Sequence, residues 1–149
     1  MPTFAKQLLD AAETALASQL AIPASSTYFE RVAPISDDEC PALNVAVGEA
    51  RKIGVVGSEG EYDLIELEVD MSFSVHTRGE ARTRVADPFV DAVNGALMRD
   101  PSLGGLAQRL GLFSLRPRQA PAGTTVGIAD VLYRARCLVR ERDLSIFTH

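Results

Sequence analysis

The stretch that decides the fold runs from Tyr62 to Arg78 and reads YDLIELEVDMSFSVHTR. From Ile65 to Val75 every second residue is apolar, and the residues between them are acidic or small and polar. A period of two sends the two sets to opposite faces of a β-strand, whereas an α-helix would mix them. The stretch therefore predicts a long strand with one buried face and one polar face.

The same alternation returns in residues 126–140, which predicts a second long strand. Its apolar set includes Val131 and Tyr133, and its other set is rich in arginine. If the two long strands pair antiparallel, the arginines face the acids of the first strand, and each such pair stabilises a sheet by about 0.2–1 kcal/mol. The residues concerned are Arg134, Arg136 and Arg140 on one strand and Glu66, Glu68 and Asp70 on the other.

Apolar residues at helical spacing predict a helix over residues 3–20. A second helix is predicted to begin at the latest with Asp87 as its N-cap and Pro88 in its first turn. Alternatively it begins nearer Glu80, with Pro88 inside it. A short third helix is predicted over residues 102–110, weakened by its glycines.

Short strands are predicted at residues 43–47 and 112–118, and a turn at 120–124. Residues 21–41 are predicted to be a connector, because three prolines keep the chain extended or turned. Residues 48–60 contain four glycines and are predicted to form a long mobile hairpin loop. This glycine run lacks the Lys-Ser/Thr ending and the following helix of a phosphate-binding loop.

Together these elements predict one α+β domain spanning residues 1–149, a length typical of a single domain. The predicted sheet is four-stranded and mostly antiparallel, with the helices packed on one face. The predicted element order is α-β-β-α-(α)-β-β. Two hairpins joined by a helix give this architecture, because each sheet must bury its apolar face against another layer.

Composition limits the partners. The net charge of −5 and the pI near 5.0 argue against a nucleic-acid binder, which needs a basic patch or stripe. The sequence has no window of about 20 apolar residues, so no membrane span is predicted, and residues 1–20 do not resemble a signal peptide. Two cysteines, Cys40 and Cys137, are too few for a disulfide framework, so we expect free thiols in a reducing cytoplasm.

The sequence offers little material for catalysis. With only His76 and His149, a histidine metal site or a Ser-His-Asp arrangement is not expected, and His76 is predicted to be an exposed residue. The acids of the first long strand have no neighbouring apolar pocket that would raise the pKa of one of them. Cys137 is predicted to be a buried thiol. We therefore expect no enzyme activity, no metal and no cofactor.

The outer face of the second long strand is mixed, because Leu132 and Leu138 share it with the arginines. Arginine is enriched in subunit interfaces. This face is therefore either an interface between copies or the partly covered sheet face of a monomer. A small enzyme or ligand-binding domain with a pocket between sheet and helices is a further alternative.

Four stretches carry a resemblance to a known family. They are DDECPALNV at 37–45, the strand at 65–78, a helix followed by DPSLGGLA at 100–107, and the last strand running into RERDL at 140–144. In these stretches the chain resembles the tail terminator proteins of long-tailed bacteriophages, the minor tail protein U-like family. The likeness covers nearly the whole chain in order and length, and its motifs are patterns rather than a fingerprint.

The resemblance implies a structural role without catalytic residues. Such proteins form a hexameric ring that caps the growing tail tube, ends its polymerisation and provides the surface that joins the head. The implied partners are other copies of the chain, the major tail tube protein and a head-completion or connector protein. The implied location is the virion tail, after assembly in the cytoplasm of the bacterial host. Other neck, head–tail joining or tail completion proteins share this size and element order and remain the alternative.

We predict that the segment 48–60 and the arginine face of the last strand lie at contacts between subunits or with the tube. A ring needs heterologous contacts that close, and a mixed sheet face with a long loop could provide them. The candidate interface residues are Arg51, Lys52, Glu66, Glu68, Asp70, Arg134, Arg136 and Arg140.

Overall fold

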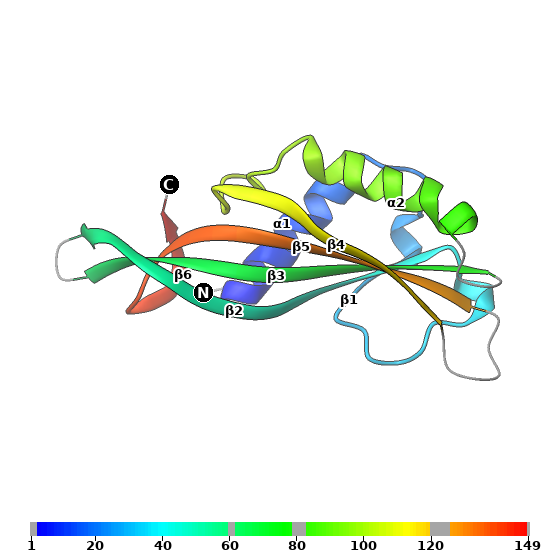
Figure 1. Ribbon diagram of the computed structural model, residues 1–149, viewed down its shortest axis with the longest axis horizontal. Helices are drawn as coiled ribbons and strands as arrows, with labels where there is room; N and C mark the ends of the chain where they lie inside the picture. The colour runs from blue at the N-terminus through cyan, green and yellow to red at the C-terminus, as the bar shows by residue number, and fades with distance from the viewer. Residues whose placement is uncertain (1–2, 60–61, 79–82, 120–125, 149) are drawn as a thin grey trace.

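The computed structural model describes residues 3–59, 62–78, 83–119 and 126–148. Within them, six strands form one mixed sheet that is accompanied by two α-helices (Figure 1). The sheet order is β1-β2-β3-β5-β4, and β6 pairs with the end of β5. The strands are β1 (Thr27–Phe29), β2 (Ala42–Glu59), β3 (Tyr62–Arg78), β4 (Arg109–Gln119), β5 (Val126–Arg140) and β6 (Asp143–Thr148). The helical segments are α1 (Phe4–Leu16), α2 (Thr83–Met98) and the 3-10 turns η1 (Ala24–Ser26) and η2 (Asp37–Glu39).

The predicted fold class is wrong. The protein is mostly β, and its sheet has six strands rather than four. The sheet is mixed because β1 pairs with β2 in parallel, inside the segment that was predicted to be a connector. β6 was not predicted at all. β1 has only three residues, which is too short to display a period of two that can be read from sequence.

The two long strands are confirmed as β3 and β5, and they pair antiparallel. Their alternate residues are buried, including Val69, Phe73 and Tyr133. The Phe73 and Tyr133 rings meet edge to face, with centroids 5.3 Å apart. Leu8 of α1 and Leu97 of α2 belong to the same core cluster, so both helices pack against the buried residues of β3 and β5.

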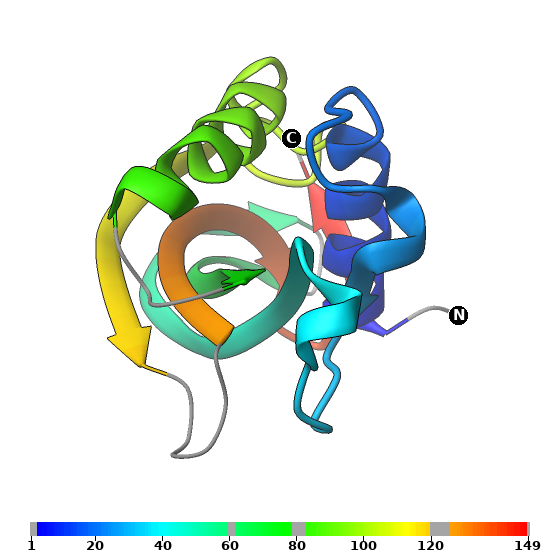
Figure 2. The ribbon, with the colours of Figure 1, turned by 90° about the vertical axis from the view of Figure 1, so that its right-hand side faces the viewer.

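The sheet is strongly twisted. Viewed end-on, β2 and β5 curl around the central strand β3 (Figure 2). Strands twist because the chirality of L-residues favours a right-handed twist, and long strands accumulate it. The helices α1 and α2 lie beside each other along the curled sheet.

The predicted loop at residues 48–60 is wrong, because β2 continues through it as far as Glu59. Arg51 pairs with Glu68 of β3, and Val55 pairs with Ile65. The register shifts three times along this pair, between Val47 and Ala50, between Lys52 and Gly54, and between Val55 and Gly57. Each extra residue breaks the alternation, so a bulged strand does not show a period of two in its sequence.

The helix predictions are confirmed only in part. α1 begins as predicted, with the Thr3 side chain accepting a hydrogen bond from the Lys6 amide, but it ends at Leu16. α2 begins at Thr83, so the alternative that leaves Pro88 inside the helix is confirmed. None of the helices described is long and apolar enough to cross a membrane.

The third predicted helix, at residues 102–110, is wrong. Leu103, Gly104 and Gly105 have φ angles of 49°, 67° and 90°, which belong to the left-handed region and cannot continue a right-handed helix. The Asp100 carboxylate accepts hydrogen bonds from the amides of Ser102 and Gly104 and holds this turn. β4 then begins at Arg109, slightly before the predicted strand. The turn predicted at 120–124 lies outside the described residues.

Candidate assembly surface

The outer face of the sheet carries a lattice of opposite charges from β2, β3 and β5. The Arg51 guanidinium donates to Asp70 at 2.8 Å and to Glu68 at 3.1 Å. Arg134 donates to the same Asp70 oxygen, Oδ1, at 3.1 Å, and Arg136 lies 3.7 Å from Glu66. The antiparallel register that places Asp70 opposite Arg134 brings these groups together. Six of the eight predicted interface residues therefore lie in one charged lattice.

The other two predicted interface residues lie at the margin of this face. Lys52 donates to Glu141 at 3.0 Å, beyond the end of β5. Arg140 is the last residue of β5 and lies opposite Leu64, six residues beyond Arg134. The sequence predicted Arg51 and Lys52 in a hairpin loop and the other six on the facing sides of the two long strands, whereas both residues lie in β2.

The lattice keeps its central acid ionised. The Arg51 guanidinium, followed by that of Arg134, lowers the pKa of the Asp70 carboxyl below its ordinary 3.8, although partial burial acts in the opposite direction. Hydrogen bonds to Asp70 and then Glu68 raise the pKa of Arg51. A carboxylate held ionised in this way is a poor proton donor, since a general acid needs a raised pKa.

Exposed apolar residues gather on β4, which is the last strand on its side of the sheet. Leu112, Phe113 and Leu115 expose about half of their surface. In the described residues β4 pairs only with β5, apart from the Leu110 amide, which donates to the Pro101 carbonyl at 2.7 Å. An unpaired strand edge that also exposes apolar side chains is a surface suited to contact with another chain.

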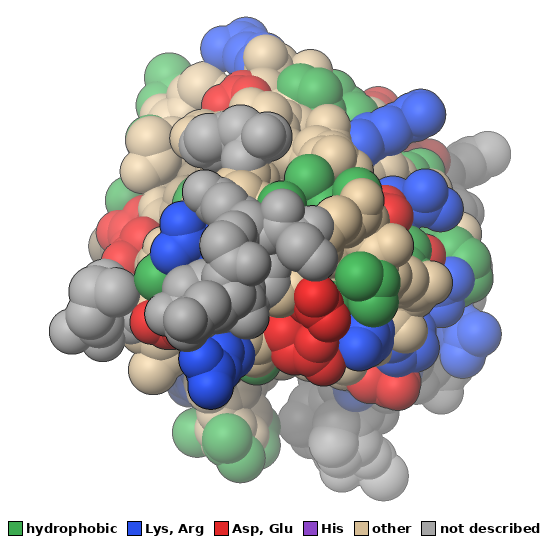
Figure 3. All heavy atoms as spheres, turned by 90° about the vertical axis from the view of Figure 1, so that its left-hand side faces the viewer, with side chains coloured by type: hydrophobic (Ala, Val, Ile, Leu, Met, Phe, Trp, Pro, Cys, Tyr) green, Lys and Arg blue, Asp and Glu red, His purple; other side chains and the backbone are tan. Residues whose placement is uncertain are grey.

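A second exposed apolar set lies on β2, at the opposite side of the sheet. Ile53, Val55 and Val56 expose between 45% and 56% of their surface. Among the described strands, β1 pairs with β2 only from Leu43 to Val45, so the later part of β2 is an open edge. Figure 3 views the end of the molecule where the β2–β3 hairpin turns, and it shows acidic, basic and hydrophobic side chains intermixed.

The β4 edge and the charged lattice meet at one contact. The Arg134 guanidinium lies over the Phe113 ring, 3.5 Å from its centroid, while it also bonds Asp70. A cation over an aromatic face is attracted by the ring quadrupole. Sequence analysis missed Phe113 and its neighbours because β4 carries a bulge between Leu112 and Ser114. The signal that could have found them is the run Leu112-Phe113 in a strand that also contains Pro117, which favours an edge.

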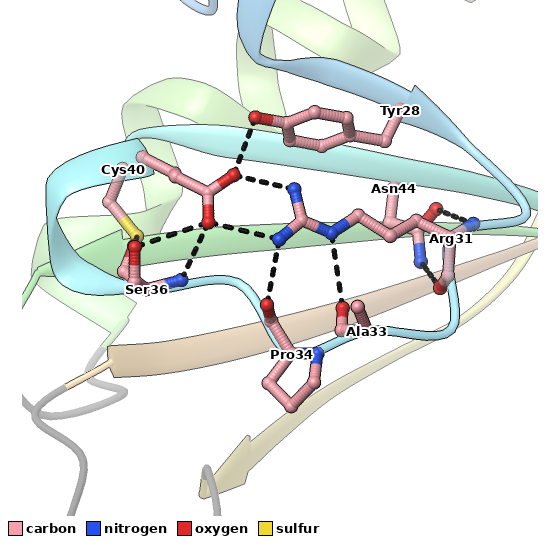
Figure 4. Close-up of polar contacts among 8 residues, drawn as sticks. Tyr28, Arg31, Ala33, Pro34, Ser36, Cys40 and Asn44 are labelled. Atoms are coloured by element: carbon pink, nitrogen blue, oxygen red, sulfur yellow. Dashed lines mark hydrogen bonds and ion pairs between the residues drawn. The ribbon is translucent and has the colours of Figure 1, made fainter.

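A polar cluster fixes the loop that follows β1 (Figure 4). The Arg31 guanidinium forms two hydrogen bonds with the Glu39 carboxylate and donates to the carbonyls of Ala33 and Pro34. The Asn44 side chain bonds both the amide and the carbonyl of Arg31. Glu39 also accepts from the Tyr28 hydroxyl at 2.8 Å. Because the loop is held at so many points, it is a rigid part of the surface.

This loop presents one apolar side chain to solvent and buries another. Val32 is 98% exposed, whereas Ile35 is buried against Cys40, Ala42 and Val126. Glu30 begins the loop with a φ of 53°, a strained conformation for a residue other than glycine. The Glu30 amide donates to the Val45 carbonyl at 2.7 Å, and this hydrogen bond stabilises the strained backbone conformation.

The prediction that His76 is exposed is wrong, since only 8% of its surface is accessible. It lines a hollow of about 310 Å³ together with Arg31, Asn44, Ser74 and Arg118. Burial, followed by the charges of Arg118 and Arg31, lowers the pKa of His76, while Asp130 acts in the opposite direction. Sequence alone placed His76 on the polar face correctly, but could not show that the loop of residues 30–36 borders it there.

The two cysteine thiols lie in the interior of the protein. Cys40 and Cys137 are both buried, and burial raises the pKa of Cys137 to about 12 and that of Cys40 above its ordinary value. A reactive thiol needs a lowered pKa and access to solvent. Across the described ranges, no group of three or more His, Cys, Asp or Glu side chains could hold a metal ion.

No family model and no curated protein matches the chain. Its structure is similar to a chain of a solved structure described as the virion of a native gene transfer agent particle. The two share 18% sequence identity over 87% of this chain and 96% of that chain, with a TM-score of 0.47. The likeness is distant, and the chain matched is part of a virion.

Proposed function

We propose that the protein is a non-enzymatic structural component of a phage or phage-like virion, which ends the tail tube as a ring. The observation that carries the proposal is the pair of open apolar edges on opposite sides of one sheet. A contact between two different patches is heterologous, and such contacts close into rings when the rotation between copies permits. The resemblance of the sequence to tail terminators supports the same role.

The chemistry of the surface supports assembly rather than catalysis. The carboxylates of the charged lattice are paired with arginines, and both thiols are buried with raised pKa values. The exposed apolar side chains instead lie where another chain could cover them. Covering them would stabilise an assembly by about 25 cal/mol for each Å² of apolar surface removed from water.

In the proposed role, six copies form a ring on the end of the tube. One side of the ring contacts the major tail tube protein, and the other contacts a head-completion or connector protein. The protein then resides in the virion tail after assembly in the host cytoplasm. The ring is proposed to form on the tube, so the free protein in solution is either a monomer or a ring.

The experiment is a mass measurement of the purified protein with and without the tail tube protein from the same genome. The proposal predicts a complex on tube ends that contains six copies of this chain. A protein that stays monomeric in both conditions contradicts the proposal. Association with a head-completion protein but not with the tube would favour the alternative neck or head–tail joining role.

A further inference from the structure

Within the described ranges, β4 has no partner strand on its side away from β5 (Figure 1). Four of its residues lie opposite alternate residues of β5, so their main-chain groups point in one direction. They are Leu110, Leu112, Leu115 and Pro117. The Leu110 amide shows that this direction is away from β5, because it donates to the Pro101 carbonyl. The amides of Leu112 and Leu115 therefore face the open side, where Pro117 has no amide hydrogen to leave unpaired.

The two faces of this edge differ in chemistry. Arg109 and Arg116 are in register with charged residues of β5 and belong to the outer face of the sheet. Leu112 and Leu115 are in register with buried residues of β5 and belong to the opposite face. All four side chains are exposed. Phe113, at the bulge, is also on the outer face, as its contact with the charged lattice shows. A strand added here would meet arginines on one face and leucines on the other.

The arginines of this edge lack acids. Arg109 lies opposite Arg136, and like charges directly across two strands are destabilising. Arg116 lies opposite Asp130, whose carboxylate already bonds Arg118. Among the described residues, neither Arg109 nor Arg116 has an ion pair or a side-chain hydrogen bond, and β4 itself contains no acid. The edge therefore favours a partner that brings carboxylates to the outer face.

Charged residues and proline also protect strand edges from unwanted pairing. Pro117 and the arginines on either side of it fit that role at the carboxyl end of β4. Earlier in the strand, Leu112, Phe113 and Leu115 are each about half exposed, and no charged residue lies between them. Protection therefore does not account for this part of the edge.

The protein already contains a pairing of the required kind between β5 and β3. Like β4, β5 carries arginines on the outer face and apolar residues on the other. Its partner β3 presents Glu66, Glu68 and Asp70 to those arginines and buries the apolar residues between them. In this fold, a strand that alternates acidic and apolar residues is thus the one that fits a strand of alternating arginine and apolar residues.

We propose that the β4 edge binds an extended segment of another virion protein, in which acidic and apolar residues alternate. This inference rests on the proposed assembly role and names the kind of partner for one surface. Main-chain hydrogen bonds to Leu112 and Leu115 continue the sheet, as in other cases of strand addition. The carboxylates of the added strand lie beside Arg109 and Arg116, and its apolar residues cover the leucines.

A second copy of this chain does not offer such a segment at the other open edge that the structure describes. In the open part of β2, Glu49 is already bonded to Arg51, and Lys52 follows. β3 has the required alternation, but it is paired on both sides. The partner is therefore a different protein, and the contacts between copies in the proposed ring are separate from this one.

The experiment is a titration of the folded protein with a synthetic peptide, followed through the amide NMR signals of the protein. The peptide is LIELEVDMS, the sequence of residues 64–72, which carries the alternation of β3. The signals of Leu112 and Leu115 should shift, and their amide hydrogens should exchange more slowly with solvent. The control peptide LIKLKVKMS replaces the three acids by lysines and should not bind.

Arg109→Glu combined with Arg116→Glu should weaken binding of the acidic peptide about tenfold, because two cross-strand charge pairs are lost. The matched control is Arg99→Glu, which changes an exposed arginine just after α2. This variant should bind the peptide as the wild type does. The NMR spectra of both variants report whether they are folded.

Unchanged signals at Leu112 and Leu115, equal binding of the lysine peptide, or wild-type binding by the folded double variant would each overturn the inference. None of these results bears on the proposed function, because the titration contains no tail tube. Failure of the folded protein to act on tail tubes, with the acidic peptide bound at β4, would overturn the proposed function and leave β4 as a strand-binding edge.

Discussion

His76 is buried beside the loop of residues 30–36, and burial decides how it responds to pH. The groups that act on its charge are Arg31 from the loop, Arg118 from β4 and Asp130 from β5. Its imidazole has an unbonded, fully buried Nδ1, so protonation places a charge where water cannot reach that atom. Such a group lowers stability when it must become charged.

The His76 pKa is lowered in the folded protein from its ordinary 6.5, so the unfolded chain binds the proton more tightly. The stability that follows from a neutral His76 is fully present above pH 6.5 and is lost as pH falls through the folded pKa. We expect His76→Gln to flatten the dependence of the unfolding free energy on pH between about 7.5 and 5.5, one unit either side of the ordinary pKa. Denaturant titration at several pH values checks this, and equal slopes for both proteins would contradict it.

Glu39 holds the loop after β1 through its carboxylate. Hydrogen bonds from Arg31, then Tyr28 and Ser36, lower the pKa of Glu39 far below its ordinary 4.5. The stabilisation is therefore present above pH 4.5 and is lost as pH falls through the folded pKa. Glu39→Gln should lower the melting temperature at pH 7, and the difference from wild type should shrink at acid pH.

The matched control for Glu39 is Asp38→Asn, which removes an exposed carboxylate from the neighbouring position. This change should leave the melting temperature at pH 7 nearly unaffected. If the two substitutions lower it equally, the cluster around Arg31 contributes nothing specific to stability.

At the scale of elements, the long strands could be predicted from sequence, whereas the exposed apolar residues of the edge strands could not. β3 and β5 are buried on one side along most of their length, and Val69 and Val131 sit in an unbroken alternation. The open edges lie in strands with bulges, where glycines and charged residues look like a loop. The part of the charged lattice shared by β3 and β5 could be predicted because it depends on the alternation. Arg51, Val55 and Phe113 lie in bulged strands and could not be placed in this way.

The pairing of β2 with β3 is reinforced by the Arg51–Asp70 contact, which can be measured by a double-mutant cycle. Arg51→Met, Asp70→Asn and the double variant should give a coupling energy of about 1 kcal/mol, the upper end for a cross-strand charge pair. Both side chains are less than one third exposed, which limits solvent screening. Unfolding free energies in urea provide the measurement.

The control cycle uses Lys6 and Asp10, an exposed pair one turn apart in α1. Exposed helical pairs of this kind contribute about 0.3–0.5 kcal/mol. The account expects the sheet pair to exceed the helix pair. A coupling energy near zero for Arg51 and Asp70 would mean that the lattice does not stabilise the sheet.

At the scale of the whole molecule, the sheet is curled (Figure 2), and among the described residues two strand edges with exposed apolar side chains have no partner strand. A monomer with such edges exposes main-chain groups and apolar side chains that another chain can cover. The sequence predicted that an interface exists through its resemblance to tail terminators and its mixed sheet face. It could not predict the open edge of β2, which depends on the order of the strands, whereas Pro117 favours an edge position for β4.

The central claim is that the protein ends a tail tube, and tube length tests it most directly. Tail tube protein from the same genome is polymerised with increasing amounts of this chain, and the tubes are measured by electron microscopy. The account predicts that tubes become shorter as the wild-type chain is added. The Phe113→Asp variant should leave the tube length unchanged, whereas the Val32→Asp variant should shorten the tubes as the wild type does. Tubes of unchanged length in the presence of excess folded wild-type protein would contradict the claim.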